Sequence, residues 1–432
     1  MEGATPVPTS VGSMRWKRLI PIAIIVYIIS FMDRTNIGFA FDGLEKSLRI
    51  GKAEAGLAGG VFFIGYLFLQ IPGGHLAEHW SAKKFVGVMI IIWGIVAILT
   101  GFVQTYWQLL IARFLLGVAE GGIWPAILVL LSHWFPAEER GRAYGFWIMN
   151  IAIASIITGP ISGLILSFAD WRWLFIVEGI FPFVIAVPIW WLFVADRPSE
   201  ASWVSPSERS YIETKLAEEQ REEPEVAGYG AVLRSGLVWK LVVVYFLIQV
   251  GFYGLNLWLP TLLKELTSKG FGVVGLIAAI PYIVAIAGLW LNGWSADRSG
   301  KYSWHVFGAM VVAAVTLVLS ILVGTSGIIL SIVLISLAMG GALAYDGPFW
   351  ATASKAMPVA LAGGAMGLIN ALGNLGGFLG PYIGGYLQQQ SNNSFLSTSY
   401  FLAGALLLAG FVMLTVHIQR RRQPPLAASQ PV

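Results

Sequence analysis

Cysteine is absent from the 432-residue sequence, and charged residues are scarce. The first absence excludes disulfide scaffolds, thiolate metal sites and cysteine nucleophiles. The second excludes an ordinary soluble domain, because only 12% of the residues are charged against roughly 25% in such domains. Apolar residues make up 57% of the chain and its mean hydropathy is +0.74. The sequence therefore predicts a polytopic membrane protein.

The apolar residues form about twelve segments long enough to cross a bilayer, which takes about 20 residues. One long hydrophilic stretch, roughly residues 196–235, divides these segments into two groups of six. We predict an all-α integral membrane protein with two six-helix bundles, at 18–194 and 237–418. Residues 1–17, 195–236 and 419–432 form the N-terminal tail, the linker and the C-terminal tail. The expected spans are 18–40, 55–75, 84–103, 107–131, 142–166, 172–194, 237–263, 272–293, 304–323, 327–349, 360–388 and 397–418.

The distribution of basic residues predicts the orientation. Of the 27 Lys and Arg residues, 19 lie in the tails, the linker and the short connections on the same side, and 6 lie in the connections on the other side. By the positive-inside rule, both termini and the linker are cytoplasmic. This rule also explains the net charge of +4 without a nucleic-acid partner. We expect a multi-pass protein of a bacterial inner membrane.

A weak internal repeat relates the two bundles. The connection at 74–84 and the connection at 293–301 both place an acid four residues after a glycine and basic residues after the acid. Six plus six spans with a repeated second–third connection is the layout of the major facilitator superfamily, whose halves move about a midplane site. The second copy matches the signature of that superfamily better than the first. We expect gating loops that contain Glu78, Asp297 and Arg298.

Charged side chains lie inside two of the expected spans. Asp33 and Arg34 belong to the first span, and Arg113 and Glu120 to the fourth. Each charge in hydrocarbon costs at least about 2.5–3.5 kcal/mol, so it persists where it pairs, lines water or carries a mechanism. A carboxylate that exchanges a proton and an arginine that binds an anion are what a proton-driven anion carrier needs. The alternative is a structural ion pair of Arg113 and Glu120, but that pair would not need a second acid and arginine.

The spacing in the fourth span adds a geometric expectation. Arg113 and Glu120 are seven residues apart, so two helical turns place them on the same face, with Arg113 as the charge partner. Gly117 and Gly121 have the small-xxx-small spacing that lets a neighbouring helix or a substrate come close to that face.

Several spans carry polar stripes that line a cavity or join helices, the latter worth about 0.6 kcal/mol per bond. The seventh span carries a stripe at i, i+4 and i+7, and the eleventh carries two asparagines at i and i+4. A hydroxylated acid would need such amides and phenols as partners for its hydroxyls. The candidate substrate-binding side chains besides Arg34 are Tyr66, Gln249, Asn256, Trp350, Asn370 and Asn374.

Five motifs in both halves carry a closer resemblance. They are Asp33-Arg-Thr-Asn-Ile-Gly-Phe-Ala40, Arg113 with Glu120-Gly121, Trp171-Arg-Trp-Leu-Phe-Ile-Val-Glu-Gly179, Gly347-Pro-Phe-Trp350 and Asn370-Ala-Leu-Gly-Asn-Leu-Gly-Gly-Phe-Leu-Gly-Pro381. The chain resembles the anion:cation symporter family within the major facilitator superfamily, which includes carriers of sugar acids, tartrate and phthalate. The resemblance implies that Asp33 and Glu120 exchange protons and that Arg34 binds the substrate carboxylate.

We therefore predict a secondary transporter that imports an organic carboxylate by proton symport with alternating access, with protons as coupling ions and no other cofactor. A monomer is the usual form in the superfamily. An anion exchanger or an efflux antiporter is an alternative, and the identity of the acid stays open. His75, Glu78 and His79 fit the spacing of a zinc-binding motif, but the sequence offers no convincing third ligand, so we expect neither a metal site nor an enzyme.

Overall fold

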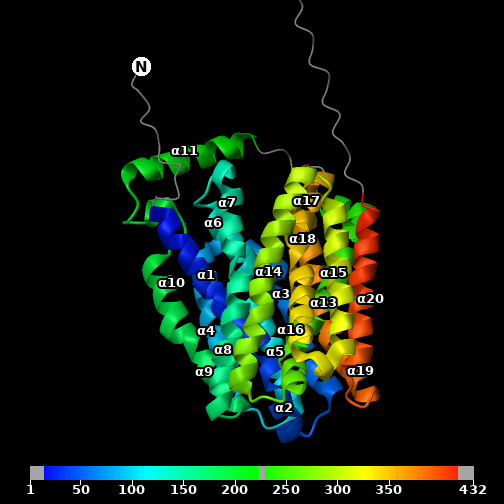
Figure 1. The fold of residues 1–432 in the computed structure, drawn as a ribbon. Helices are drawn as coiled ribbons and strands as arrows, with labels where there is room; N and C mark the ends of the chain where they lie inside the picture. Colours follow the sequence, from blue (N-terminus) through cyan, green and yellow to red (C-terminus); the bar gives the residue numbers. More distant parts are fainter. Residues whose placement is uncertain (1–13, 223–228, 358, 417–432) are drawn as a thin grey trace, which may run out of the picture.

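The computed structural model describes residues 14–222, 229–357 and 359–416, and these residues form helices and short connections without a strand. Figure 1 shows the helices arranged side by side, with α11 lying across one end of the molecule and α2 at the opposite end. The first half contains α1 (Met14–Thr35), α2 (Ile37–Leu48), α3 (Lys52–Leu76), the π-helix η1 (Ala77–Ser81), α4 (Ala82–Thr100), α5 (Tyr106–Gly121), α6 (Ile123–Ser132), α7 (Ala137–Ile148), α8 (Asn150–Phe168), α9 (Trp171–Phe181), the π-helix η2 (Pro182–Ala186) and α10 (Val187–Phe193).

The linker and the second half follow in the same way. The linker contains the 3-10 helix η3 (Pro198–Glu200), α11 (Pro206–Glu222) and α12 (Tyr229–Arg234). The second half contains α13 (Gly236–Thr267), α14 (Phe271–Ser299), α15 (Tyr302–Val323), the 3-10 helix η4 (Gly324–Gly327), α16 (Ile328–Ala344), α17 (Asp346–Ala356), α18 (Val359–Gly373), α19 (Gly376–Gln390) and α20 (Phe395–Leu414).

The twelve expected spans are present. Within the described ranges, nine helical runs are long and apolar enough to cross a membrane. Two of them, Lys52–Thr100 and Tyr302–Ala356, contain 49 and 55 residues, more than twice the roughly 20 that one span needs. The first run turns at Ser81, whose backbone is extended, and the second at Gly324, whose φ of 51° favours glycine. Each therefore forms two spans, and the pair α18 and α19 forms the twelfth.

Five of the spans contain a break in the helix, which the sequence analysis did not anticipate. The breaks separate α1 from α2 at Asn36, α5 from α6 at Gly122, α7 from α8 at Met149, α16 from α17 at Tyr345, and α18 from α19 at the turn 374–375. A broken helix frees backbone groups at its ends, and transporters commonly place their sites at such breaks. The first break follows Asp33 and Arg34 directly.

The two halves are sealed against each other at the end remote from α11. A Cβ atom on Gly56 of α3 would lie 2.2 Å from the carbonyl oxygen of Pro381 in α19, and one on Gly38 of α2 would lie 2.4 Å from that of Leu257 in α13. The backbones therefore touch there. At the end near α11, a Cβ atom on Gly145 of α7 would meet nothing within 4 Å.

The first part of the linker, up to α11, packs on the first half. Arg140 of α7 pairs with Glu219 of α11 at 2.9 Å. The ring of Trp203 stacks on Trp134 with 4.9 Å between centroids and an interplanar angle of 7°. These contacts fix α11 to the first half.

Candidate functional site

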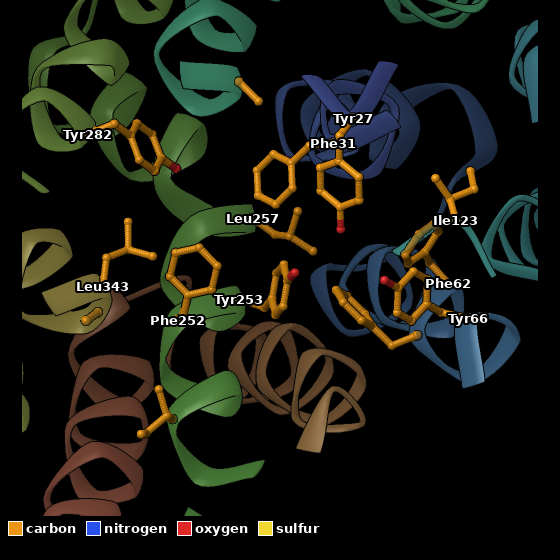
Figure 2. Packing of buried hydrophobic residues seen from close by; sticks show 14 of the residues in the cluster. Tyr27, Phe31, Phe62, Tyr66, Ile123, Phe252, Tyr253, Leu257, Tyr282 and Leu343 are labelled. Carbon is orange, nitrogen blue, oxygen red and sulfur yellow. The ribbon is translucent and has the colours of Figure 1, made fainter. Parts of the chain in front are cut away.

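Arg34 lies at the end of α1 inside a cage of aromatic rings. Its side chain is buried, with only 4% exposed. A guanidinium over aromatic faces is stabilised by the ring quadrupoles, which partly replaces its lost hydration. Figure 2 shows Tyr27, Tyr66 and Tyr253 turning their hydroxyls toward the space between the halves. The guanidinium carbon lies 4.6, 5.1, 5.6 and 5.9 Å from the ring centroids of Tyr66, Phe62, Phe31 and Tyr27.

Arg34 connects the acid of the first half to the second half. Its Nη2 lies 3.4 Å from Oε2 of Glu120 in α5, and its Nη1 donates to the hydroxyl of Tyr253 in α13 at 3.4 Å. Ser30 donates to the same Glu120 oxygen at 2.9 Å. Among the described residues, Oε1 of Glu120 has no hydrogen-bond partner. One arginine thus touches both a buried carboxylate and the opposite half.

Arg113 remains an electrostatic neighbour of Glu120, but the two side chains form no direct ion pair among the described residues. Arg113 is fully buried, and its Nη1 and Nη2 donate to the backbone carbonyls of Asp33 and Arg34, each at 3.1 Å. The break after α1 explains this, because the last carbonyls of a helix lack intrahelical donors. Glu120 forms its direct salt bridge with Arg34, whereas Arg113 binds the end of α1.

Asp33 is buried, with 1% of its surface exposed. Neither of its carboxyl oxygens has a hydrogen-bond partner among the described residues. Its electrostatic neighbours include Glu120, Glu178 and Arg113. An ionised carboxylate without hydrogen bonds is expensive to bury, so this position suits a group that carries a proton during part of a cycle.

Three polar candidates of the second half, Gln249, Asn370 and Asn374, form one hydrogen-bonded network. Gln249 of α13 donates from Nε2 to Oδ1 of Asn374 at 3.1 Å and accepts from the hydroxyl of Tyr345 at 3.3 Å. Asn374 donates to Oδ1 of Asn370 at 3.1 Å, and Asn370 donates to Oε1 of Gln70 in α3 at 3.1 Å. The last bond crosses between the halves.

Trp350 of α17 lies beside this network. Its indole nitrogen donates to Oδ1 of Asp346 at 3.1 Å, and its ring centroid is 5.3 Å from that of Tyr245. Tyr245 in turn donates to Oδ1 of Asn370 at 3.5 Å. Trp350 is thus linked to the amides and is half-buried.

Asn256 lies apart from the other amides. It lines a small cavity of about 20 Å³ between α1, α8, α13 and α14, together with Thr35, Ser155, Thr158 and Tyr282, a volume that holds about one water molecule. Its Nδ2 has no partner among the described residues. In Figure 2, Tyr282 and Tyr66 lie on opposite sides of α13.

The expected gating residues lie at the end of the molecule near the linker. Oε1 of Glu78 in η1 is 3.5 Å from Nε2 of His133. Asp297 accepts from the hydroxyl of Tyr302 at 3.2 Å, and Arg298 lies over the ring of Trp294 at 5.6 Å. These residues contact their own half, and their part in gating stays a prediction.

One further intramembrane acid was not singled out from the sequence. Glu178 of α9 is 1% exposed, and its carboxyl oxygens accept from Asn36 and Ser162. The signal that identified Asp33 and Glu120, an acid within an apolar run, applies equally to Glu178. The phenols of Tyr27, Tyr245 and Tyr345 were also missed, because tyrosine is common in membrane spans for other reasons.

Comparisons with known proteins follow the same architecture. A family model described as Major Facilitator Superfamily matches residues 23–381. Over 406 residues the chain is 32% identical to a protein of Agrobacterium vitis named as a tartrate transporter, covering 92% of this chain and 93% of that protein. Over 414 residues it is 29% identical to the quinolone resistance transporter of Acinetobacter baumannii, covering 94% of each.

Among solved structures, a bacterial homologue of the human lysosomal transporter Spinster, inward-facing and occupied, has a similar fold. The TM-score is 0.73 at 15% sequence identity, covering 95% of this chain and 96% of that chain. At this identity the likeness concerns the fold alone.

Proposed function

The chain belongs to the major facilitator superfamily of transporters, and we propose that it imports an organic carboxylate together with protons. It is a multi-pass membrane transporter and not an enzyme. The observation that carries the proposal is the contact of Arg34 with both Glu120 and Tyr253 of the opposite half.

This contact can couple the movement of the proton to the movement of the substrate. While Glu120 is ionised, it occupies the guanidinium that an incoming carboxylate needs. Protonation of Glu120 removes its charge and frees Arg34 for a bidentate pair with the substrate. Substrate and proton therefore enter together, and loss of the proton restores the Arg34–Glu120 pair and expels the substrate.

The shape of the molecule fits one state of an alternating-access cycle. With the linker on the cytoplasmic side, as the basic residues indicate, the sealed end faces outward. The structure then corresponds to a state that is closed to the outside. Tyr253 connects Arg34 to the second half. Substrate binding at Arg34 therefore changes a contact between the two halves.

The substrate we propose is a hydroxylated carboxylic acid such as a sugar acid or tartrate. Arg34 binds the carboxylate, and the network of Gln249, Asn370 and Asn374 offers amides to hydroxyl groups. The relative named as a tartrate transporter supports this class. We further propose that the protein works as a monomer in the bacterial inner membrane with both termini cytoplasmic.

Exchange or efflux is the second candidate, favoured by the relative named as a quinolone resistance transporter. Uptake into liposomes of purified protein separates the two. Labelled sugar acids, tartrate and phthalate are offered under an inward proton gradient. Symport predicts accumulation of one acid, abolished by a protonophore. Exchange without accumulation, or export of a quinolone, would overturn the import proposal.

A further inference from the structure

Glu178 is a buried carboxyl that the coupling of Arg34 and Glu120 does not use. It lies in α9, with 1% of its surface exposed. Oε2 accepts a hydrogen bond from Nδ2 of Asn36 at 2.9 Å, and Oε1 accepts one from Oγ of Ser162 in α8 at 2.7 Å. Both partners are neutral, and among the described residues no basic side chain forms a salt bridge with Glu178. A buried carboxylate without a cation is costly, so a proton is the simplest counter-charge.

The place of Asn36 ties this carboxyl to the substrate site. Asn36 is the residue between α1 and α2, two positions after Arg34, and it is fully buried. Its backbone nitrogen continues α1 by donating to Met32 at 2.9 Å, and its carbonyl accepts from Phe39 at 2.9 Å. Glu178 therefore binds the residue at the break between α1 and α2, and Arg113 binds the carbonyls just before that break.

The side chain of Asn36 has an unused acceptor. Its Oδ1 has no hydrogen-bond partner among the described residues. An amide offers donors at one end and an acceptor at the other. When Glu178 is ionised, Nδ2 donates to the carboxylate. When Glu178 is protonated, a half-turn of the amide lets the carboxylic acid donate to Oδ1 instead.

We propose that Glu178 is a third proton-exchanging carboxyl of the transport cycle and that Asn36 is the positioning residue that reports its state to the α1–α2 break. The inference rests on the proposed proton symport. The proton adds to Oε2 of Glu178, the amide of Asn36 turns, and the proton returns to water when the site opens on the other side. No covalent bond other than the O–H bond forms or breaks.

The surroundings of Glu178 leave few other groups to explain such a titration. The helices packed against α9 include α1, α2, α4 and α8. On α1, Asp33 interacts electrostatically with Glu178, whereas Arg34 pairs with Glu120. On α8 there is no ionisable residue. The other ionisable groups are Arg15, Lys17, Arg18 and Tyr27 on α1, Asp42, Glu45 and Lys46 on α2, Lys83 and Lys84 on α4, and Arg172 on α9 itself. Among the described residues, the hydrogen-bond partners of Glu178 are Asn36 and Ser162 alone.

The test is the proton-to-substrate ratio, measured in liposomes from the pH gradient that balances a known gradient of the transported acid. Wild type must first show proton coupling; if it does not, the proposed function fails, not this inference. Glu178→Gln keeps the size and hydrogen bonding of the side chain but cannot ionise, and we expect its ratio to fall by one proton. Ser162→Ala removes one hydrogen bond and leaves the acid, so its ratio should equal that of wild type. A Glu178→Gln ratio equal to that of wild type would overturn the proposal.

A second measurement tests the proposal if the Glu178→Gln protein does not fold. Infrared difference spectra of wild type and Ser162→Ala are recorded across a pH titration. The carboxylic C=O band of Glu178 should appear on acidification and should shift in Ser162→Ala, because only that carboxyl loses a hydrogen bond. Titration bands that are identical in the two proteins would show that Glu178 does not exchange protons.

Discussion

Nη2 of Arg34 lies 3.4 Å from Oε2 of Glu120, and both side chains are buried. The two residues come from α1 and α5, and the same guanidinium also contacts Tyr253 of the other half. An anion can bind Arg34 bidentately only by displacing Glu120. This competition is the centre of the proposed coupling, and the predictions below depend on it.

Glu120→Gln should uncouple transport from the proton gradient. The amide cannot ionise, so Arg34 stays free and the substrate can enter without a proton. We expect gradient-driven accumulation to fall by at least about tenfold, equivalent to about 1.4 kcal/mol, while exchange between preloaded vesicles and medium continues. Glu219→Gln, which breaks the partly exposed pair with Arg140, is the control and should accumulate substrate normally. If Glu120→Gln still accumulates substrate against a gradient, Glu120 is not the coupling acid.

Arg34→Lys should weaken substrate binding although it keeps the charge. An ammonium lacks the planar fork that matches a carboxylate and packs less well within the aromatic cage. We expect KM for the transported acid to rise about tenfold or more, corresponding to roughly 1.4 kcal/mol. Arg172→Lys is the matched control, because Arg172 also lies over an aromatic ring, at 4.2 Å from Trp171, but near the start of α9. Equal KM values for the two variants would contradict the role of Arg34.

Gly117→Ala should destabilise the first half. A Cβ atom at Gly117 would lie 2.0 Å from the backbone oxygen of Phe62 in α3, so the two helices must move apart. Overpacking of this kind costs typically about 1–3 kcal/mol, and Tm in detergent should fall by several degrees. Gly145→Ala, with open space around the added Cβ atom, should unfold within a degree or so of wild type. The reverse order of the two Tm values would show that the packing of α5 on α3 is not as described.

Removal of two ion pairs at the sealed end should favour its opening. Lys264 pairs with Asp42, and Lys52 pairs with Glu265 at 3.5 Å, each pair joining the two halves. Partly exposed pairs contribute about 0.2–1 kcal/mol each, so loss of both should shift the equilibrium at least about twofold. Because the chain has no cysteine, the shift can be followed with one introduced thiol, Leu257→Cys, which is buried against Gly38.

The thiol is modified with an impermeant maleimide from outside the cell. The variant Lys52→Gln with Lys264→Gln should react faster than the background with intact pairs. Lys215→Gln, which removes a surface charge from α11, should leave the rate unchanged. Unchanged labelling in the double variant would mean that these pairs do not hold the sealed end.

Much of the site could be predicted because burial of charge is expensive. Asp33, Arg34, Arg113 and Glu120 stand out in apolar runs for that reason alone, and the structure brings all four to the junction of α1 and α5. The close approach expected at Gly117 and Gly121 is confirmed. A Cβ atom added at these positions would lie 2.0 and 2.2 Å from the backbone oxygens of Phe62 and Tyr66.

The pairing within the site could not be predicted, because it depends on a break in α1 that leaves no clear mark in the sequence. A seven-residue spacing correctly places Arg113 and Glu120 on one face, but the free carbonyls at the end of α1 draw Arg113 away. The acid then pairs with Arg34 instead. The hydrogen bonds of Asn370 and Gln70 likewise depend on how the halves meet, which no local pattern encodes.

The most direct test of the coupling is whether binding of substrate takes up a proton. Purified wild-type protein in a weakly buffered detergent solution with a pH indicator is mixed with the acid identified by the uptake panel. We predict that the pH rises on binding, because the acid displaces Glu120 from Arg34 and Glu120 then takes a proton, and that Glu120→Gln binds the acid without this rise. Binding by wild type with no proton uptake, or equal uptake by both proteins, would contradict the account.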